Sequence, residues 1–477
     1  MNGDRGPRLP RLTRRETVLA AALLATLPLV NPYLRGEGNG YYAYVRSLVL
    51  DHDLRFDDEY RRGDAGFVSQ SFRKADGQPW PPMVLPGGYL RNQWSVGPSL
   101  LWLPSFAQAH LAVLLLRELG RDVAADGYSL PYRAACALAT AGYAFLGLFL
   151  AYRAAARITG PAAALLATVA LWLASSLPVY VYFLPFYSHA LASFGVSLFL
   201  WYWLTRRPLV RTRQWLTWGL TGGLVWQLEP LAGLVLVAAA VEWVAALRPT
   251  APPAAGDALR AAVTRAAAFC GAALLAAIPQ LVIKSIIHGS ALRTGTLNRY
   301  FWDAPRLLDV GFASEHGLFL WTPVLLVSVA GLLMLCRRDP VAGAGLLAAF
   351  ASTYYVVSCY EAWHGISSFG NRFFVGLTPA FVVGAAVALQ GAHALLAPRL
   401  SAAGASIALA LSVALLAAWN AGLVFQWGTS MVPRQGPVDF ALVARNQVTA
   451  VPRRIAGLAL RYVAARQETT REQERKD

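Results

Sequence analysis

The polar stretch after the first apolar run reads Gly36-Glu37-Gly38-Asn39-Gly40-Tyr41-Tyr42-Ala43-Tyr44-Val45-Arg46. It places the carboxylate of Glu37 just beyond a hydrophobic segment and follows it with a short amphipathic helix rich in tyrosine. A charged side chain beside a bilayer is costly unless it is solvated, paired or used, so its default interpretation is a functional site. The three glycines give a backbone that lets chain or ligand approach closely. The tyrosines suit a membrane–water interface.

The composition outside this stretch is that of a membrane protein. The chain has 477 residues, of which 56% are hydrophobic and 14% charged, and its mean hydropathy is +0.43. A soluble protein carries roughly a quarter charged residues. The net charge of +16 does not indicate nucleic acid as a partner, because the basic residues form clusters between apolar runs, as cytoplasmic loops do. We therefore predict an all-α polytopic membrane protein that contacts membrane lipids.

About eleven membrane spans are expected from the apolar runs. The apolar segment 98–116 is not counted, and we predict that it lies on the surface or is re-entrant. If it crossed, the loops with Arg153, Arg207 and Arg337 would move to the outer face, against the positive-inside rule. The predicted spans are 17–34, 131–152, 161–183, 189–205, 214–229, 230–247, 263–287, 317–336, 341–359, 373–395 and 401–425. Within 214–247, Glu229-Pro230 separates two short helices or kinks one long helix.

This count defines the domains and the topology. Residues 1–16 form a basic cytoplasmic N-terminus, 17–427 a single transmembrane domain, and 428–477 a basic C-terminal tail that is amphipathic over 446–466. The outer, extracytoplasmic face then receives the first loop and three shorter segments, and by the same count the tail lies there too. These outer segments are 35–130, 184–188, 288–316 and 360–372.

Three motifs in these outer segments resemble the GT-C superfamily of polytopic glycosyltransferases. The first comprises Glu37, Tyr41, Ala43, Arg46 and Asp53 after a first helix. The second is the stretch 90–98 (LRNQWSVGP), and the third is 368–374 (SFGNRFF) with Pro379 downstream. This superfamily includes the protein O-mannosyltransferases and the aminoarabinose transferases of lipid A. The resemblance covers residues 17–395, with one departure: the family usually has Asp at the position of Glu37. It implies a GT-C-like helical bundle with juxtamembrane helices in the first loop.

The resemblance also implies an activity. Such an enzyme moves a hexosyl or pentosyl group from a polyprenyl-phosphate carrier to a lipid, polysaccharide or protein acceptor, at the extracytoplasmic face of the bacterial plasma membrane. An inverting transfer needs a base for the acceptor hydroxyl, and Glu37 is the candidate. The leaving phosphate needs fixed cations, and Arg91 and Arg372 suit it because guanidinium grips phosphate bidentately. Tyr41 and Asn92 complete the predicted donor site.

Cations outside this set receive a different prediction. Lys284 is a weaker candidate for the phosphate. For both Arg46 and Lys284 we favour snorkelling of a long cationic side chain to the interface.

Two further groups could bind the sugar. The loop at 360–365 combines the carboxylate of Glu361, the indole of Trp363 and the imidazole of His364, and sugar sites often combine such groups. His189 begins a span at a position where relatives often place a second acidic group. A structural role for this lone histidine is the alternative.

We do not predict a metal or a cofactor, and a divalent metal is left as an open alternative. Asp51 and Asp53 form an Asp-x-Asp pattern, but a bare pair of this kind is common and does not by itself indicate a divalent cation site. His288 and His316 lack partners at ligand spacing.

Two other functions remain open. A transporter or flippase of lipid-linked sugar should show repeats or charges near the centres of its spans. Mid-span charges are nearly absent, and charged and aromatic groups gather at one face, which favours an interfacial enzyme. A degenerate family member with a structural role would be indicated by unchanged activity after substitution of Glu37.

Overall fold

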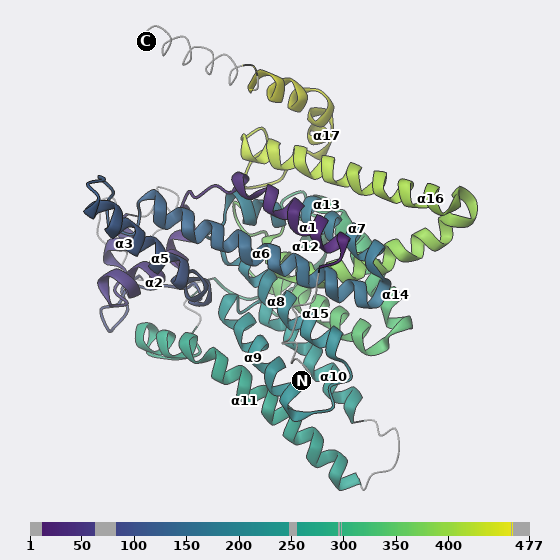
Figure 1. Cartoon of the computed structure of the whole chain (residues 1–477), viewed down its shortest axis with the longest axis horizontal. Coiled ribbons are helices and arrows are strands. Elements are labelled where there is room, and N and C mark those ends of the chain that lie inside the picture. The colour runs from purple at the N-terminus through teal and green to yellow at the C-terminus, as the bar shows by residue number, and fades with distance from the viewer. Residues whose placement is uncertain are drawn as a thin grey trace, which may run out of the picture.

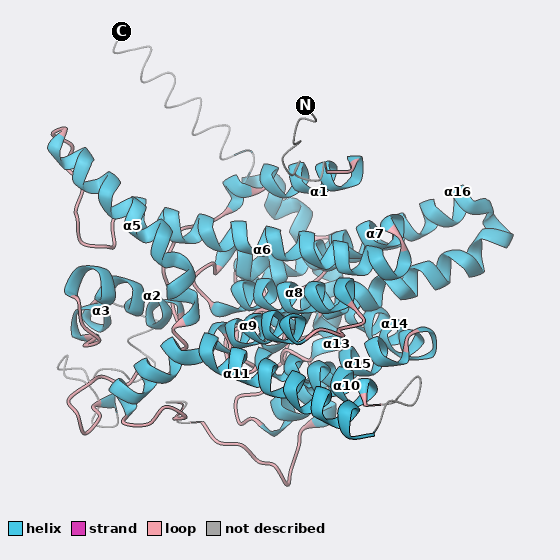
Figure 2. Ribbon diagram, turned by 60° about the horizontal axis from the view of Figure 1, so that its bottom comes forward, coloured by secondary structure: helices cyan, strands magenta, loops and turns pink. Residues whose placement is uncertain are grey.

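A computed structural model describes residues 12–62, 83–247, 255–293, 296, 298–458 and 460. These residues form helices and two isolated β-bridges, and no strand (Figures 1 and 2). The α-helices are α1 (Arg14–Ala25), α2 (Gly38–Arg46), α3 (Asp57–Arg61), α5 (Gly97–Glu118), α6 (Leu130–Thr159), α7 (Pro161–Leu173), α8 (Ser188–Arg206), α9 (Thr212–Leu228), α10 (Val237–Ala246), α11 (Ala255–His288), α12 (Leu307–Phe312), α13 (Leu318–Trp321), α14 (Val324–Arg338), α15 (Pro340–Cys359), α16 (Thr378–Gly428) and α17 (Phe440–Val448). Shorter helical turns are η1 (Leu27–Leu29), η2 (Ser47–Asp51), η4 (Val179–Phe183), η5 (Ala232–Leu236) and η6 (Arg372–Leu377).

Five helices in the described part of the chain are long and apolar enough to cross a membrane. They are Gly97–Glu118, Leu130–Thr159, Ala258–His288, Pro340–Cys359 and Arg372–Gly428. Shorter apolar helices, among them α7, pack between them (Figure 1). The predicted class, an all-α polytopic membrane protein, is confirmed. The count of eleven spans stays a prediction.

Several predicted boundaries are wrong for identifiable reasons. The first span was expected at 17–34, but α1 ends at Ala25 and a turn containing Pro28 follows, since proline removes a backbone donor. The predicted span 131–152 continues to Thr159, where Gly160 with φ of +88° separates α6 from α7. For the region 214–247, the alternatives were two short helices or one long kinked helix. The structure has two helices, because α9 ends at Leu228 before Glu229-Pro230.

The apolar segment 98–116 forms one continuous helix, α5. Trp102 Nε1 donates to Thr140 Oγ1 at 2.8 Å, and the ring of His110 lies 2.7 Å from Tyr132 Oη. These contacts hold α5 antiparallel to the first part of α6, so its C-terminal end lies near the start of α6. Its length would permit a crossing, and the prediction that it does not cross remains open.

The two predicted faces of the bundle are each held together by contacts. On the predicted inner face, Glu16 pairs with Arg153 at 2.7 Å and Arg207 pairs with Asp339 at 2.7 Å. On the opposite face, the Glu315 carboxylate accepts from the backbone N–H of Gly436 at 2.9 Å. The start of the C-terminal tail therefore lies beside the outer segment 288–316. Residues 1–11 of the predicted cytoplasmic N-terminus and residues 461–477 of the predicted basic tail lie outside the described residues.

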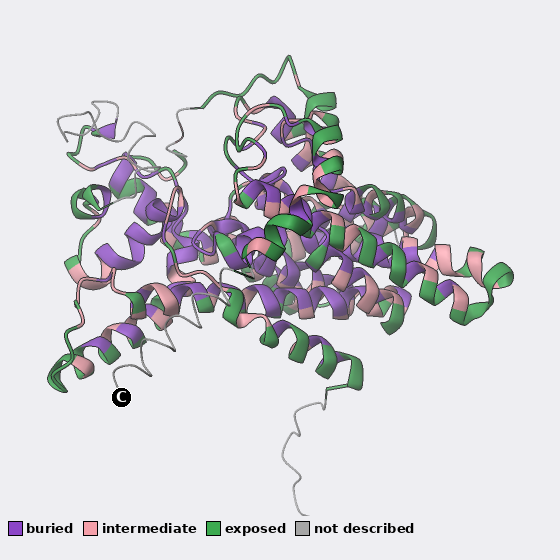
Figure 3. Cartoon of the chain, turned by 90° about the horizontal axis from the view of Figure 1, so that it is seen from above, coloured by how far each residue is buried: buried purple, intermediate pink, exposed green. Residues whose placement is uncertain are grey.

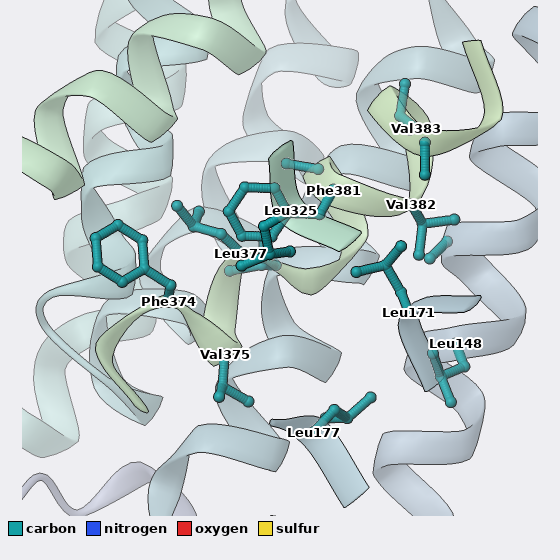
Figure 4. Packing of buried hydrophobic residues seen from close by; sticks show 14 of the residues in the cluster. Leu148, Leu171, Leu177, Leu325, Phe374, Val375, Leu377, Phe381, Val382 and Val383 are labelled. Atoms are coloured by element: carbon teal, nitrogen blue, oxygen red, sulfur yellow. The ribbon is translucent and has the colours of Figure 1, made fainter. Parts of the chain in front are cut away.

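The buried hydrophobic residues form two clusters. The larger one joins α6, α7, α8, α14, α15 and α16, and Figure 4 shows part of it, including Leu171, Leu325, Phe374 and Phe381. The smaller one surrounds α2 and α5, and Figure 3 shows both clusters as the buried interior of the bundle.

The second cluster corrects the prediction for α2. Every residue of α2 is buried, and Tyr42 and Tyr44 are 0% exposed. The Tyr42 hydroxyl donates to the carbonyl of Gly127 at 2.5 Å, and the Tyr44 hydroxyl donates to that of Trp94 at 3.1 Å. These tyrosines are therefore core residues with satisfied hydroxyls and do not lie in an interfacial aromatic belt. The helix is fixed in protein on all sides, which makes its N-terminus a rigid support for Glu37.

Candidate active site

Glu37 is positioned by the glycines that flank it. It stands at the N-terminal end of α2, after Gly36 in the left-handed backbone region at φ of +52°. A Cβ on Gly36 would overlap the hydroxyl of Tyr187, and one on Gly40 would overlap the ring of Trp94. The glycines thus allow neighbouring aromatic side chains to pack against the backbone, as the sequence indicated.

Arg372 forms an ion pair with Glu37 although 335 positions separate them. Its Nη2 lies 2.5 Å from Glu37 Oε1, with side-chain exposures of 9% for Arg372 and 17% for Glu37. The guanidinium also lies over the rings of Tyr187 and Phe373, at 5.9 and 5.5 Å from their centroids. Arg372 Nε is buried and has no hydrogen-bond partner among the described residues. The predicted base and one of the predicted phosphate ligands are therefore in direct contact.

A cavity of about 730 Å³ lies beside this pair. Its lining comes from α2, α8, α9, α11 and α15 and from three of the predicted outer segments, while Tyr187 of the fourth contacts Arg372. Charged or titratable side chains in the lining are Glu37, Tyr41, Arg91, His189, Glu229, Lys284, Arg293, Tyr300, Tyr360 and Arg372. Trp94, Trp226 and Phe373 add aromatic surface. Three arginines, Arg91, Arg293 and Arg372, face two carboxylates, so the cavity has a positive surplus that suits an anionic group.

His189 and Glu229 form a second pair in this lining. His189 Nδ1 lies 3.1 Å from Glu229 Oε1 and 3.2 Å from Oε2. The Tyr41 hydroxyl donates to Ser188 Oγ at 2.9 Å and is close enough to Glu37 and Glu229 for both charges to act on it. Burial, with smaller contributions from the charges of Glu37 and Glu229, raises the pKa of Tyr41 well above its usual value. Tyr41 is therefore a neutral hydroxyl at physiological pH.

Sequence reasoning did not include Glu229 in the site. The residue was considered only as a break between two helices, because its carboxylate precedes Pro230. The signal that could have found it is a single acidic residue inside an otherwise apolar run, which is itself an indication of function.

The predicted phosphate ligands divide into two kinds. Arg91 lines the cavity, and its backbone is fixed by the Tyr60 hydroxyl, which donates to the Arg91 carbonyl at 2.9 Å. Asn92 does not line the cavity. Its Nδ2 donates to the carbonyl of Gly40 at 2.9 Å and its Oδ1 accepts from the N–H of Trp94 at 3.1 Å. Asn92 thus ties α2 to the segment before α5 and supports the site from behind.

Two cations that were expected to snorkel are buried instead. Lys284 is 3% exposed and lines the cavity, where its Nζ donates to the carbonyls of Asn92 and Trp94 at 2.7 and 2.9 Å. Arg46 is 8% exposed and pairs with Asp51 and Glu59 at 2.5 and 2.6 Å. Both predictions are wrong because carbonyls and carboxylates folded over these residues satisfy the cations inside the protein.

The loop at 360–366 borders the cavity through residues other than those predicted. Tyr360, Ala362 and Ile366 line it. Of the predicted residues, Glu361 accepts from the N–H of Arg299 at 3.0 Å, Trp363 is 5% exposed, and His364 lies 3.4 Å from Glu315. The structure does not bring these three side chains into the cavity.

The Asp-x-Asp pattern is engaged in local contacts. Asp51 pairs with Arg46, and Asp53 accepts from the Ser47 hydroxyl at 2.8 Å. Within the described part of the chain, no group of three or more His, Cys, Asp or Glu side chains is arranged to hold a metal ion.

Comparison with known proteins relates this arrangement to a fold. No family model matches the sequence, and no curated protein matches it. The structure is similar to a crystal structure of the oligosaccharyltransferase of Archaeoglobus fulgidus in complex with Zn and sulfate. The TM-score is 0.52 and the identity 16%, over 84% of this chain and 52% of that one.

Two further solved structures are similar. A structure of the same oligosaccharyltransferase, tethered to an acceptor peptide containing an NVT sequon, gives a TM-score of 0.50 and 14% identity, over 89% of this chain and 56% of that one. ArnT from Cupriavidus metallidurans gives a TM-score of 0.44 and 15% identity, over 91% of this chain and 73% of that one. The chain spans about half the length of the oligosaccharyltransferase. The likeness to that enzyme shows the fold alone, which is the GT-C fold that the sequence motifs implied.

Proposed function

We propose that this protein is a glycosyltransferase that moves a sugar from a polyprenyl-phosphate carrier to an acceptor at the extracytoplasmic face of the bacterial plasma membrane. The observation that carries the proposal is the Glu37–Arg372 ion pair at the edge of a cavity whose cations outnumber its carboxylates. The protein shares its fold with an oligosaccharyltransferase. A structure of that enzyme contains an acceptor peptide, which supports a protein as one of the three kinds of acceptor considered.

The two members of the ion pair have different roles in this proposal. Glu37 accepts the proton of the acceptor hydroxyl as the hydroxyl oxygen attacks the anomeric carbon from the side opposite the phosphate, so that the configuration inverts. Arg372 stabilises the charge that develops on the leaving phosphate, and its unpartnered Nε is a donor not committed to Glu37. Arg91, Lys284 and Arg293 add positive charge to the same cavity.

The test is transfer from polyprenyl-phosphate sugars, each labelled in the sugar, by the purified full-length protein in liposomes. The wild type should release polyprenyl phosphate and label an acceptor, and Glu37→Gln should lower the rate about 10³-fold. Glu242→Gln is the matched control, because Glu242 is also buried and paired with an arginine, Arg207 at 2.9 Å, but does not line the cavity. Movement of labelled donor across the bilayer without cleavage would instead indicate a flippase. Equal rates for wild type and Glu37→Gln would exclude Glu37 as the base.

A further inference from the structure

The His189–Glu229 pair is the part of the cavity to which the roles above assign nothing. Both side chains are almost entirely buried, at 4% and 10% exposure. His189 is held at the N-terminal end of α8 between two aromatic rings, with centroids at 4.9 Å for Tyr180 and 6.1 Å for Tyr187. Glu229 directly follows the end of α9. Two separate helices therefore fix the relative position of the imidazole and the carboxylate.

The burial of this pair determines how many protons it holds. Among the described residues, His189 is the only basic side chain within ion-pair distance of Glu229. An ionised carboxylate buried beside a neutral imidazole lacks a counter-charge, which is costly. One additional proton would lower this cost, either as an imidazolium facing a carboxylate or as a neutral Glu229 donating to Nδ1. In both arrangements the Nε2 atom of His189 carries a hydrogen.

The Nε2 atom has no partner inside the protein. It is buried and makes no hydrogen bond to any described residue, although a buried N–H normally has an acceptor. His189 lines the cavity together with Arg372, and both contact the ring of Tyr187. A phosphate bound to Arg372 would supply an oxygen as the missing acceptor.

We propose that the His189–Glu229 pair is the general acid of the site, which donates the Nε2 proton to the leaving phosphate oxygen. This role rests on the proposed glycosyl transfer and adds to it. The acceptor O–H bond breaks and its proton goes to Glu37, while the acceptor oxygen forms a bond to the anomeric carbon. The bond from that carbon to the phosphate oxygen breaks with its electron pair, and this oxygen takes the proton from His189. The proton on Glu37 then returns to the pair through water, so that no further reactant is required.

Other titratable and charged groups surround the pair, and they must stay unchanged in any test. Tyr180 and Tyr187 face His189, and the charge of Arg372 acts on both tyrosines. Tyr41 is influenced by the charges of both Glu37 and Glu229. Because a general acid must carry its proton to act, the transfer rate should fall at alkaline pH.

The first experiment measures transfer as a function of pH for wild type, His189→Gln and Glu229→Gln, with the polyprenyl-phosphate sugar that the wild type uses. Both variants should lose about 10²-fold in kcat, and the alkaline fall in rate should disappear while the acidic limb remains. His393→Gln is the matched control, since His393 is half-buried, does not line the cavity, and is bonded to Ala402 and Ser406 in α16. Loss of the acidic limb instead would make the pair a base and overturn the proposal. Variants that keep the wild-type rate and profile would also overturn it.

A second measurement does not depend on activity. The ¹⁵N chemical shift of His189 Nε2 in the full chain, assigned by its absence in His189→Gln, reports whether that nitrogen carries hydrogen. We expect a protonated Nε2 at neutral pH in the wild type and a population without hydrogen in Glu229→Gln. An unprotonated Nε2 in the wild type would contradict the proposal that His189 is the general acid, even if sugar transfer is confirmed. Failure of the wild type to transfer any sugar would instead count against the proposed function.

Discussion

Glu37 and Glu229 line the same cavity but are paired with different bases. Glu37 faces the guanidinium of Arg372, which keeps its protons at any physiological pH, whereas Glu229 faces an imidazole that can gain or lose one. The first pair therefore always contains a cation, and we call it the permanent pair. In the proposed mechanism, the second pair holds the proton that is donated to the leaving phosphate. Sites that need an acid and a base at the same pH commonly use two groups whose surroundings differ in this way, so the partner of each carboxylate decides its role.

The largest effect is expected from breaking the permanent pair. Arg372→Gln removes the cation from both Glu37 and the leaving phosphate, and the transfer rate should fall about 10³-fold across the whole pH range. Arg372→Lys keeps the charge but not the planar fork, so it should recover part of the loss. Steady-state transfer in liposomes measures both variants. If Arg372→Gln changed the shape of the pH profile as His189→Gln does, the two pairs would not have separate roles.

The next effect concerns stability and compares the two pairs directly. Glu37→Ala leaves a buried guanidinium that cannot lose its proton, and this should cost about 3 kcal/mol. Glu229→Ala leaves His189, which can become neutral, and should cost only about 1 kcal/mol. Titration with a denaturing detergent, followed by the loss of helical circular dichroism, gives the free energy of unfolding for each variant. Equal losses would show that the two pairs are alike in charge.

The sequence indicated both members of the Glu37–Arg372 pair but gave no indication that Glu229 belongs to the site. Glu37 and Arg372 both lie in short polar segments with recognisable motifs, and the even number of crossings predicted between them indicated the same face for both. Glu229 has no motif and lies among apolar residues. Its function depends on His189, which is 40 positions away, and only the packing of α8 against α9 brings the two together.

The same limit explains the predictions that failed around the site. The distribution of apolar runs gives the helices and the face on which loops meet, because those follow from the thickness of the membrane. It does not show which loop residues turn inward. Tyr360 lines the cavity while Glu361 binds the backbone of Arg299, and this difference depends on the isolated bridge between Tyr300 and Tyr360. Likewise, Arg46 and Lys284 are buried because acceptors from distant segments cover them.

A third carboxylate outside the cavity tests how far an arginine partner alone keeps a glutamate ionised. Glu59 in α3 is 2% exposed and pairs with Arg46, but Arg46 also binds Asp51, and Glu59 Oε2 is buried without a partner. One guanidinium shared by two carboxylates compensates only one charge. Burial therefore raises the pKa of Glu59 from 4.5 to about 7, despite the opposing effect of Arg46.

This raised pKa gives the smallest of the predicted effects, and its sign is fixed by linkage. Below about pH 4.5 Glu59 is protonated in both the folded and unfolded states, and its contribution to stability is complete. Between that pH and about 7, the unfolded chain releases the proton more readily than the folded one, so stability falls as the pH rises. The melting temperature of the wild type should therefore decrease by about 2 °C over this range relative to Glu59→Gln, which holds the neutral form at every pH. If the melting temperatures of the two proteins changed equally with pH, Arg46 would keep both carboxylates ionised. The number of carboxylates that share an arginine would then not affect their ionisation.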